Sequence, residues 1–239
     1  MITWLPEIDS TNNEAARNLA TAPEGSVWAA HFQTAGRGQQ NNTWESDAGK
    51  NFMFSLLLRP AWLPAEDQFY ISKIASLGLC DFLTQHAISA AIKWPNDCYV
   101  NHKKMAGMLI EHHIGGHTLN ASIIGIGLNA NQEKFSKTAG NPTSMLLESG
   151  CSVAIETALP ELVAAILRRY RLLQQGGMQR IDEEYHARLY RLNEWRRFET
   201  DKRRFLAKLV AVQRNGQVLL LDETGKTNAF AFKEVRFML

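Results

Sequence analysis

Residues 33–46, QTAGRGQQNNTWES, combine one cation, four consecutive side-chain amides and one aromatic ring, with no aliphatic side chain larger than alanine. This composition excludes a core strand or an amphipathic helix. Gly36 and Gly38 allow the backbone to pass close to a ligand, and Arg37 between them supplies a fixed charge for a carboxylate or a phosphate. Because ordering a loop costs about 1–2 kcal/mol per residue, we expect this one to be mobile when empty and ordered over its ligand. Trp44 either stacks on a base or packs in the core.

A second group of polar residues lies on or beside predicted strands. KWPND, residues 93–97, places a lysine, an aromatic ring, a rigid turn, an amide and a carboxylate in five positions. In KKMAGMLIE, residues 103–111, Gly107 interrupts an apolar strand, and a glycine there often marks the close approach of a ligand. Lys104 precedes this glycine, so its amine can face the same space. The plainer alternatives are an ordinary turn and a solvated lysine.

Two further segments offer polar groups at the ends of elements. DSTN, residues 9–12, presents hydroxyls and an amide that either cap a helix or contact a small polar ligand. IGIGLNAN, residues 124–131, lacks the third glycine and the following helix of a dinucleotide fingerprint, but its Asn129 follows the strand directly and can bind a ligand. His112 and His113 face opposite sides of a regular strand, so we expect no metal site.

A mixed set of helices and strands must position these residues. The apolar pattern predicts strands within residues 1–5, 25–34, 51–60 and 90–97, and a β-hairpin over 104–129 with glycines 115 and 116 at its tip. It predicts helices from residue 10, with Thr11 and Glu14 as a capping box, over 68–86, over 141–150 with Pro142 at the first position, and over 157–175 and 178–190.

From Phe198 onward only short strand-like runs remain. RNGQ, residues 214–217, predicts a two-residue hairpin turn, since Asn-Gly tolerates a positive φ. The sequence therefore predicts an α+β domain over residues 1–190 and a small C-terminal β-barrel or sandwich over 191–239.

The composition is that of a globular protein of 239 residues, with 45% hydrophobic and 21% charged residues and a formal net charge of +2. That charge is too small to indicate nucleic-acid binding. Three separated cysteines favour a reducing compartment, and we expect a cytoplasmic protein with no signal peptide and no membrane span.

The order of the motifs resembles that of the biotin protein ligases. DSTN, QTAGRG with a tryptophan eight residues after its first glycine, KWPND, KKMAGML and GIGLN follow one another as in that family, most clearly over residues 8–150. The resemblance implies a mixed sheet with helices related to class II aminoacyl-tRNA synthetases, followed by an SH3-like C-terminal β domain. It also implies activation of biotin by ATP, with Mg²⁺, to biotinyl-5′-AMP, and transfer of biotin to a lysine of a biotin carboxyl carrier protein.

The same resemblance implies roles for individual residues. Lys104 and Arg37 are implied as catalytic, and the biotin contacts are implied to be Ser10, Thr11, Asn12, Gln33, Arg37, Gly38, Gln39 and Lys104. The nucleotide contacts are implied to be Trp44, Lys93, Asn96, Asp97 and Asn129. No protein-bound metal is implied, and the oligomeric state is left open, with a homodimer among the alternatives. The chain departs from the family's common GRGRRGR loop, because GRGQQNN carries amides in place of the later arginines.

Two other functions remain as alternatives. A lipoate–protein ligase follows the same two-step chemistry, although the polar STN and QTAGRG segments suit a ureido ring better than a dithiolane. A nucleic-acid-binding protein could use residues 188–214, a range that contains nine basic residues and three acidic ones. Because the sequence at the start of the chain shows no helix-turn-helix, we expect no sequence-specific DNA binding.

Overall fold

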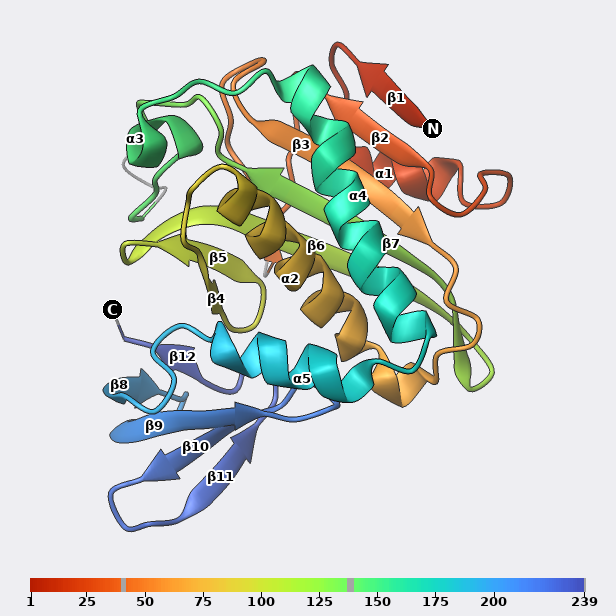
Figure 1. Cartoon of the computed structure of the whole chain (residues 1–239). Helices are drawn as coiled ribbons and strands as arrows, with labels where there is room; N and C mark the ends of the chain where they lie inside the picture. The colour runs from red at the N-terminus through yellow and green to blue at the C-terminus, as the bar shows by residue number, and fades with distance from the viewer. Residues whose placement is uncertain (40–41, 137–139, 239) are drawn as a thin grey trace.

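The computed structural model describes residues 1–39, 42–136 and 140–238 and contains two β-sheets (Figure 1). The larger sheet has seven strands in the order β1-β2-β3-β7-β6-β5-β4. Only β1 and β2 pair in parallel, and the remaining neighbours are antiparallel, so the sheet is mixed. The strands are β1 Ile2–Leu5, β2 Val27–Ala30, β3 Phe52–Leu58, β4 Ala91–Lys93, β5 Asp97–Val100, β6 Lys103–Gly115 and β7 Thr118–Leu128.

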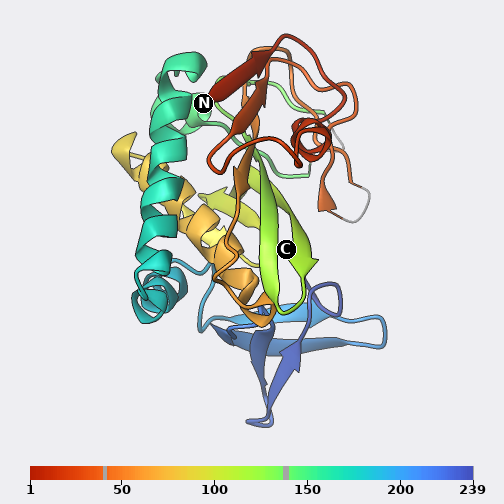
Figure 2. The ribbon, with the colours of Figure 1, turned by 90° about the vertical axis from the view of Figure 1, so that its right-hand side faces the viewer.

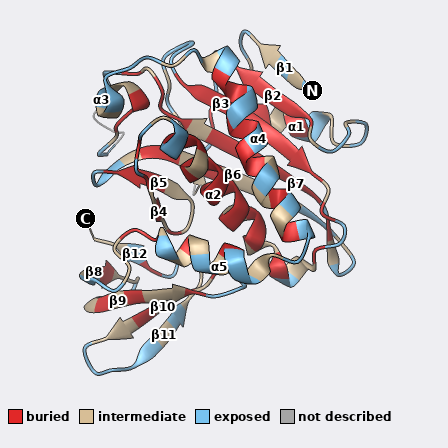
Figure 3. Ribbon diagram, viewed as in Figure 1, coloured by how far each residue is buried: buried red, intermediate tan, exposed pale blue. Residues whose placement is uncertain are grey.

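Helices lie on both faces of this sheet. α2 (Phe69–Gln85), α4 (Ile155–Gln174) and α5 (Met178–Ala187) lie on one side, while α1 (Thr11–Arg17) lies on the other with the segment that follows β2 (Figure 2). All seven residues of β3 are buried because the central strands are covered on both faces (Figure 3). The α1 side is the thinner cover, and this leaves room for a site.

A five-stranded antiparallel sheet follows the larger one, in the order β11-β10-β9-β8-β12. Its strands are β8 Trp195–Glu199, β9 Arg204–Val212, β10 Val218–Asp222, β11 Thr227–Phe230 and β12 Arg236–Phe237. The α+β class and the C-terminal all-β region predicted from the sequence are thus confirmed. The two sheets share one hydrophobic core. Trp94 Nε1 donates to the carbonyl oxygen of Gly216 at 2.9 Å, and the guanidinium of Arg214 pairs with the buried carboxylate of Asp67.

Most predicted elements are present, and the differences lie at their ends. α1 begins after Ser10, whose side chain makes no capping hydrogen bond, so the predicted capping box at Thr11 is wrong. The helix predicted from Pro142 begins later, as α3, Met145–Ser149, because the preceding residues pair with the backbone of Lys104. The Oγ of Ser144 caps this helix by accepting the Leu147 N–H.

Two further element ends differ from the prediction. α5 ends at Ala187 rather than at residue 190, because the chain then pairs with β4 through the N–H groups of Ile92 and Tyr190. The β9–β10 hairpin exists, but in its turn only Gly216 has a positive φ, and Gln213 pairs with Gln217. The turn therefore has three residues instead of two.

Candidate active site

A cavity of about 460 Å³ is lined by α1, the segment after β2, strands of the larger sheet and the C-terminal sheet. Its described lining comes from residues 10–12, 33, 37–39, 42–44, 93–97, 104, 107–109, 125–127, 199–201 and 232–237. Polar segments that are far apart in the sequence therefore share one space.

A buried hydrogen-bond network forms the end of the cavity beside α1. Ser10, Thr11 and Asn12 are each less than 5% exposed. The N–H of Thr11 donates to Gln33 Oε1 at 2.8 Å, which joins the helix start to the segment after β2. The hydroxyl of Ser55 in β3 forms hydrogen bonds to Thr11 Oγ1 at 2.8 Å and to Asn12 Oδ1 at 2.6 Å. These contacts fix the orientation of the polar groups, so a rigid polar ligand can be recognised there.

Two glycines of β7 make room for side chains of the site. A Cβ added at Gly125 would lie 2.1 Å from Asn12 Oδ1, and one added at Gly127 would lie 2.3 Å from Cε2 of Trp44. The strand therefore needs glycine at both positions because side chains cross its face. The indole N–H of Trp44 is buried without a hydrogen-bond partner among the described residues. An unsatisfied buried donor of this kind is stabilised by a ligand that accepts from it.

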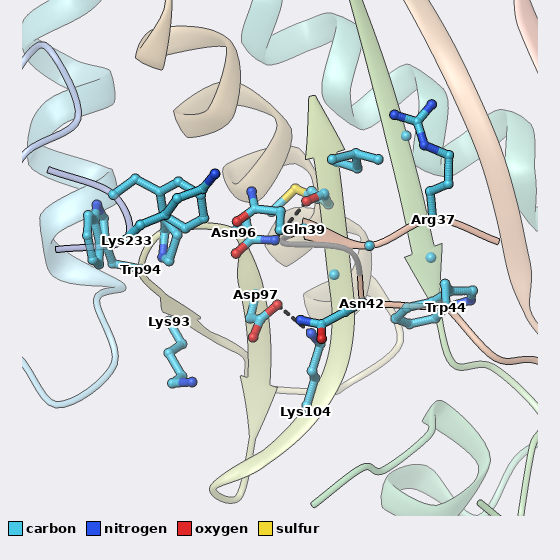
Figure 4. A pocket seen from close by; sticks show the side chains of 18 of the residues that line it. Arg37, Gln39, Asn42, Trp44, Lys93, Trp94, Asn96, Asp97, Lys104 and Lys233 are labelled. Atoms are coloured by element: carbon cyan, nitrogen blue, oxygen red, sulfur yellow. Dashed lines mark hydrogen bonds and ion pairs between the residues drawn. The ribbon is translucent and has the colours of Figure 1, made fainter. Parts of the chain in front are cut away.

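Arg37 lines the cavity but pairs with another residue of the protein. Its Nη2 lies 2.6 Å from Glu111 Oε1, and its Nη1 donates to Asn13 Oδ1 at 2.8 Å. Glu111 also accepts from Asn12 Nδ2 at 2.7 Å. The guanidinium points away from the side of the pocket that holds Lys104 (Figure 4). Its charge is thus placed beside the buried polar network rather than beside Lys104.

The segment around Arg37 folds back on itself. Gly38 N donates to the Asn42 carbonyl at 2.7 Å, and Trp44 N donates to the Gly36 carbonyl at 3.0 Å. Gln39 and Asn42 both line the cavity, whereas Gln40 and Asn41 lie outside the described residues. The segment is therefore tied at its base and at Trp44.

Lys104 is a cation of the cavity wall. Its ammonium lies 2.7 Å from Asp97 Oδ1, and both side chains are partly exposed to the cavity (Figure 4). A Cβ at Gly107 would lie only 3.3 Å from Lys104 Nζ, so the glycine gives the ammonium its space. The backbone of Lys104 is fixed by Asn141 O at 2.8 Å and by Thr143 N at 2.8 Å. Lys104 is therefore a preorganised cation with one carboxylate partner.

The KWPND segment forms the wall between the two sheets. Asn96 Nδ2 donates to the carbonyl oxygen of Met108 at 2.8 Å, which fixes the turn against β6. Lys93 Nζ donates to the hydroxyl of Tyr99 at 3.2 Å and lies 4.8 Å from the centre of that ring. Burial holds the pKa of Lys93 below its usual value. An anion beside this ammonium would offset that effect.

Asn129 is not among the residues that line the cavity, in contrast to the other predicted site residues. It is buried, and its Nδ2 donates to the carbonyl oxygen of Thr143 at 2.9 Å. Its visible role is to hold the segment 141–143, which in turn fixes Lys104.

Sequence reasoning missed several residues of this site. Ser55 and Glu111 organise the α1 end of the cavity, and both lie within strands predicted as apolar. The single polar side chain in FMFSLLL was the available signal for Ser55. Residues 199–201 and 232–237 of the C-terminal sheet also line the cavity, and no local pattern marks them.

Within residues 1–39, 42–136 and 140–238 there is no group of three or more His, Cys, Asp or Glu side chains that could hold an ion. His112 instead contacts the hydroxyl of Ser122 at 2.9 Å, and burial lowers its pKa to about 4. In the same residues no helix is long and apolar enough to cross a bilayer.

The fold and cavity define a class of protein: a mixed-sheet domain whose cavity has a buried hydrogen-bond network at the α1 end and two lysines, Lys93 and Lys104, in its wall. The model of the biotin/lipoate A/B protein ligase family matches residues 4–129. The chain belongs to this family.

Individual relatives cover most of the chain. A biotin–[acetyl-CoA-carboxylase] ligase of Paracoccus denitrificans is 35% identical over 197 residues, covering 80% of this chain and 81% of that protein. The bifunctional ligase/repressor BirA of Bacillus spizizenii is 28% identical, covering 92% and 69%. Among solved structures, the biotin protein ligase of Aquifex aeolicus in complex with biotin and ATP superposes with a TM-score of 0.84 at 24% identity, covering 99% of this chain and 98% of that one.

Proposed function

We propose that this chain is a biotin–protein ligase that activates biotin with ATP and transfers it to a lysine of a biotin carboxyl carrier protein. The observation that carries this function is that one cavity collects the DSTN, QTAGRG, KWPND and KKMAG segments around Lys104. The similarity to a biotin–[acetyl-CoA-carboxylase] ligase supports the same activity.

In the first half-reaction a carboxylate oxygen of biotin attacks the α-phosphorus of ATP. A new oxygen–phosphorus bond forms, the α–β anhydride bond breaks, and pyrophosphate leaves with the electron pair. Two anions must meet for this to happen, so a cation beside both of them lowers the barrier. Lys104 is placed for this role because its ammonium faces the cavity and is already oriented by Asp97.

In the second half-reaction the amine of a carrier lysine attacks the acyl carbon of biotinyl-5′-AMP. The acyl–oxygen bond breaks, AMP leaves with the electron pair, and the amine loses a proton. Lys104 again lies beside the oxygen atoms on which charge develops. The carrier protein is the partner that this chemistry requires.

The α1 end of the cavity suits the ureido ring of biotin. Ser10, Thr11, Asn12 and Gln33 offer hydroxyls and amides that can match a carbonyl oxygen and two N–H groups. The Ser55 hydroxyl holds Thr11 and Asn12 in place. A dithiolane ring has no polar groups to satisfy this network, which is why biotin is preferred over lipoate.

The nucleotide is assigned to the other end of the cavity. Trp44 contributes a ring face and a buried N–H that has no partner among the described residues, while Lys93, Asn96 and Asp97 line the cavity on the side of Trp94 (Figure 4). Asn129 acts indirectly by holding the backbone around Lys104. Magnesium enters with ATP as part of the substrate. We propose that the enzyme acts in the cytoplasm.

We also propose that the catalytic domain spans residues 1–190 and that residues 191–239 form the C-terminal domain.

The direct test is incubation of the protein with ATP, Mg²⁺, biotin and a biotin carrier domain, followed by the intact mass of the carrier. We expect an added biotinyl group on one lysine, and none when lipoate replaces biotin. A carrier that gains lipoyl instead would assign the chain to lipoate transfer, and a carrier that stays unmodified would contradict both activities.

The segment 33–46 is proposed as a lid that closes over the ligand. Hydrogen exchange and proteolysis of this segment are expected to slow when biotin and ATP are added, because bound ligand offsets the cost of ordering it. Gln39→Arg and Asn42→Arg, which place a cation at the cavity, are expected to slow adenylate release about threefold to tenfold. Asn120→Arg is the matched control, since it adds the same charge on an exposed residue away from the cavity.

Two outcomes would contradict this proposal separately. Equal protection of the segment with and without ligands contradicts the lid. Equal adenylate release from the parent, Gln39→Arg and Asn42→Arg proteins contradicts the role of charge.

A further inference from the structure

A closed turn of the C-terminal sheet, residues 231–234, presents a lysine to the cavity. Ala231 N donates to Glu234 Oε2 at 2.7 Å, and Glu234 N donates to the Ala231 carbonyl at 3.1 Å. Val235 is buried directly after the turn. The turn is therefore held by its own hydrogen bonds and anchored in the core, which leaves Lys233 at its tip.

The backbone of Lys233 lies in the left-handed region, with a φ of 80°. Side chains other than glycine, asparagine and aspartate are uncommon there, and such strained positions gather at functional sites. The Lys233 side chain lines the cavity on the side of Trp94, opposite Arg37 and Trp44 (Figure 4). The turn thus keeps a lysine at a backbone position where glycine would be less strained.

Lys233 differs from most other cations of the cavity in having no acidic partner. Arg37 pairs with Glu111, Lys104 with Asp97 and Arg236 with Glu199. Among the residues that the structure describes, Lys233 has no ion pair and no hydrogen bond, and its ammonium lies 5.8 Å from the centre of the Phe232 ring. Its full charge is therefore available to an anion in the cavity.

The turn is held against the KWPND segment. The rings of Phe232 and Trp94 lie 6.4 Å apart, and Trp94 also donates to the carbonyl oxygen of Gly216. Lys233 therefore belongs to the same wall as Lys93. The segment 33–46, in contrast, offers amides at positions 39–42 and no second cation after Arg37. The described part of the C-terminal sheet lines the cavity with two cations, Lys233 and Arg236, and with three acidic residues, Glu199, Asp201 and Glu234. Arg236 is paired with Glu199, so Lys233 is the cation that this sheet offers to a ligand.

We propose that Lys233 binds the β- and γ-phosphates of ATP and the pyrophosphate that leaves when the α–β bond breaks. This inference rests on the proposed function. The ammonium neutralises charge that develops on the bridging oxygen as the electron pair moves onto pyrophosphate. The C-terminal sheet then supplies a contact for the leaving group, while Lys104 remains beside the carboxylate and the α-phosphate.

The test compares Lys233→Ala, Lys233→Gly and Lys233→Arg with Lys226→Ala. Lys226 is an exposed lysine of the same sheet outside the cavity, so it controls for the loss of a charge. Lys233→Ala and Lys233→Gly are expected to raise the KM for MgATP about tenfold, while the KM for biotin changes less than about twofold. Direct binding should weaken for ATP and for inorganic pyrophosphate but not for AMP, which lacks the β- and γ-phosphates.

Lys233→Gly separates charge from structure because glycine adopts the positive φ without strain. We expect it to melt at or above the temperature of the parent and still to lose ATP affinity, whereas Lys233→Arg keeps that affinity. An unchanged KM for MgATP in a folded Lys233→Gly protein would overturn the assignment. A parent protein that makes no biotinyl-5′-AMP would instead overturn the proposed function, so the two failures are distinguishable.

Discussion

Replacing Lys104 with alanine is expected to lower the rate of biotinyl-5′-AMP formation by about three orders of magnitude and to leave the protein folded. The ammonium of Lys104 lies on the cavity wall, 2.7 Å from Asp97 Oδ1, and it is the cation best placed between a carboxylate and an α-phosphate. Without it, the two anions approach each other beside an Asp97 carboxylate that has lost its ion-pair partner, so the substitution removes attraction and adds repulsion.

The measurement is pyrophosphate release with biotin and MgATP, accompanied by a thermal melt. Lys103→Ala is the matched control, because Lys103 is the exposed neighbour on the same strand and does not line the cavity. Lys104→Arg keeps the charge and is expected to retain part of the rate. Near-normal pyrophosphate release by a folded Lys104→Ala protein would falsify the catalytic role.

Gly125→Ala is expected to raise the KM for biotin by about two orders of magnitude, although it adds only one methyl group. The new Cβ would lie 2.1 Å from Asn12 Oδ1, which is closer than two unbonded atoms can come. Asn12 is buried and bonded to Ser55 and Glu111, so it cannot move without breaking that network. A hundredfold change corresponds to about 2.7 kcal/mol of binding free energy. This is about the contribution of one or two charge-assisted or buried hydrogen bonds.

Gly115→Ala provides a control with the same chemical change. Its Cβ would meet Asn120 Nδ2, also at 2.1 Å, but Asn120 is exposed at the end of the β6–β7 hairpin and can turn away. We expect Gly115→Ala to keep the parent's KM for biotin. If the two variants bind biotin equally well, the network around Asn12 is not the biotin site.

The sequence by itself determined the fold class and most of the elements of the larger sheet. Nearly continuous apolar runs such as FMFSLLL predicted buried strands, and helical periodicity predicted α2 and α4, since both signals depend on neighbours within a few residues. The order of short motifs predicted which polar residues would share a space. Of the predicted site residues, Lys104, Arg37, Gln33 and the STN group all line one cavity.

Element ends were less predictable because competing contacts decide them. Thr11 and Glu14 satisfied a local capping rule, yet α1 is capped by no side chain, since its first residues bond to Gln33 and Ser55 instead. Pro142 was suited to a helix start, but its segment pairs with Lys104 and the helix begins later. In both cases a long-range hydrogen bond replaced the local one.

Only the tertiary structure decided which residues organise the site from a distance. Glu111 is 74 residues from Arg37 in the sequence and 99 from Asn12, and yet it bonds to both. Lys233 meets the KWPND wall only because the C-terminal sheet shares a core with the larger sheet and places its turn beside Trp94. Local sequence patterns indicate which secondary structure a residue and its near neighbours favour. Charge pairing and cavity shape arise from side chains that the fold brings together, and this is why they appear only once the chain is folded.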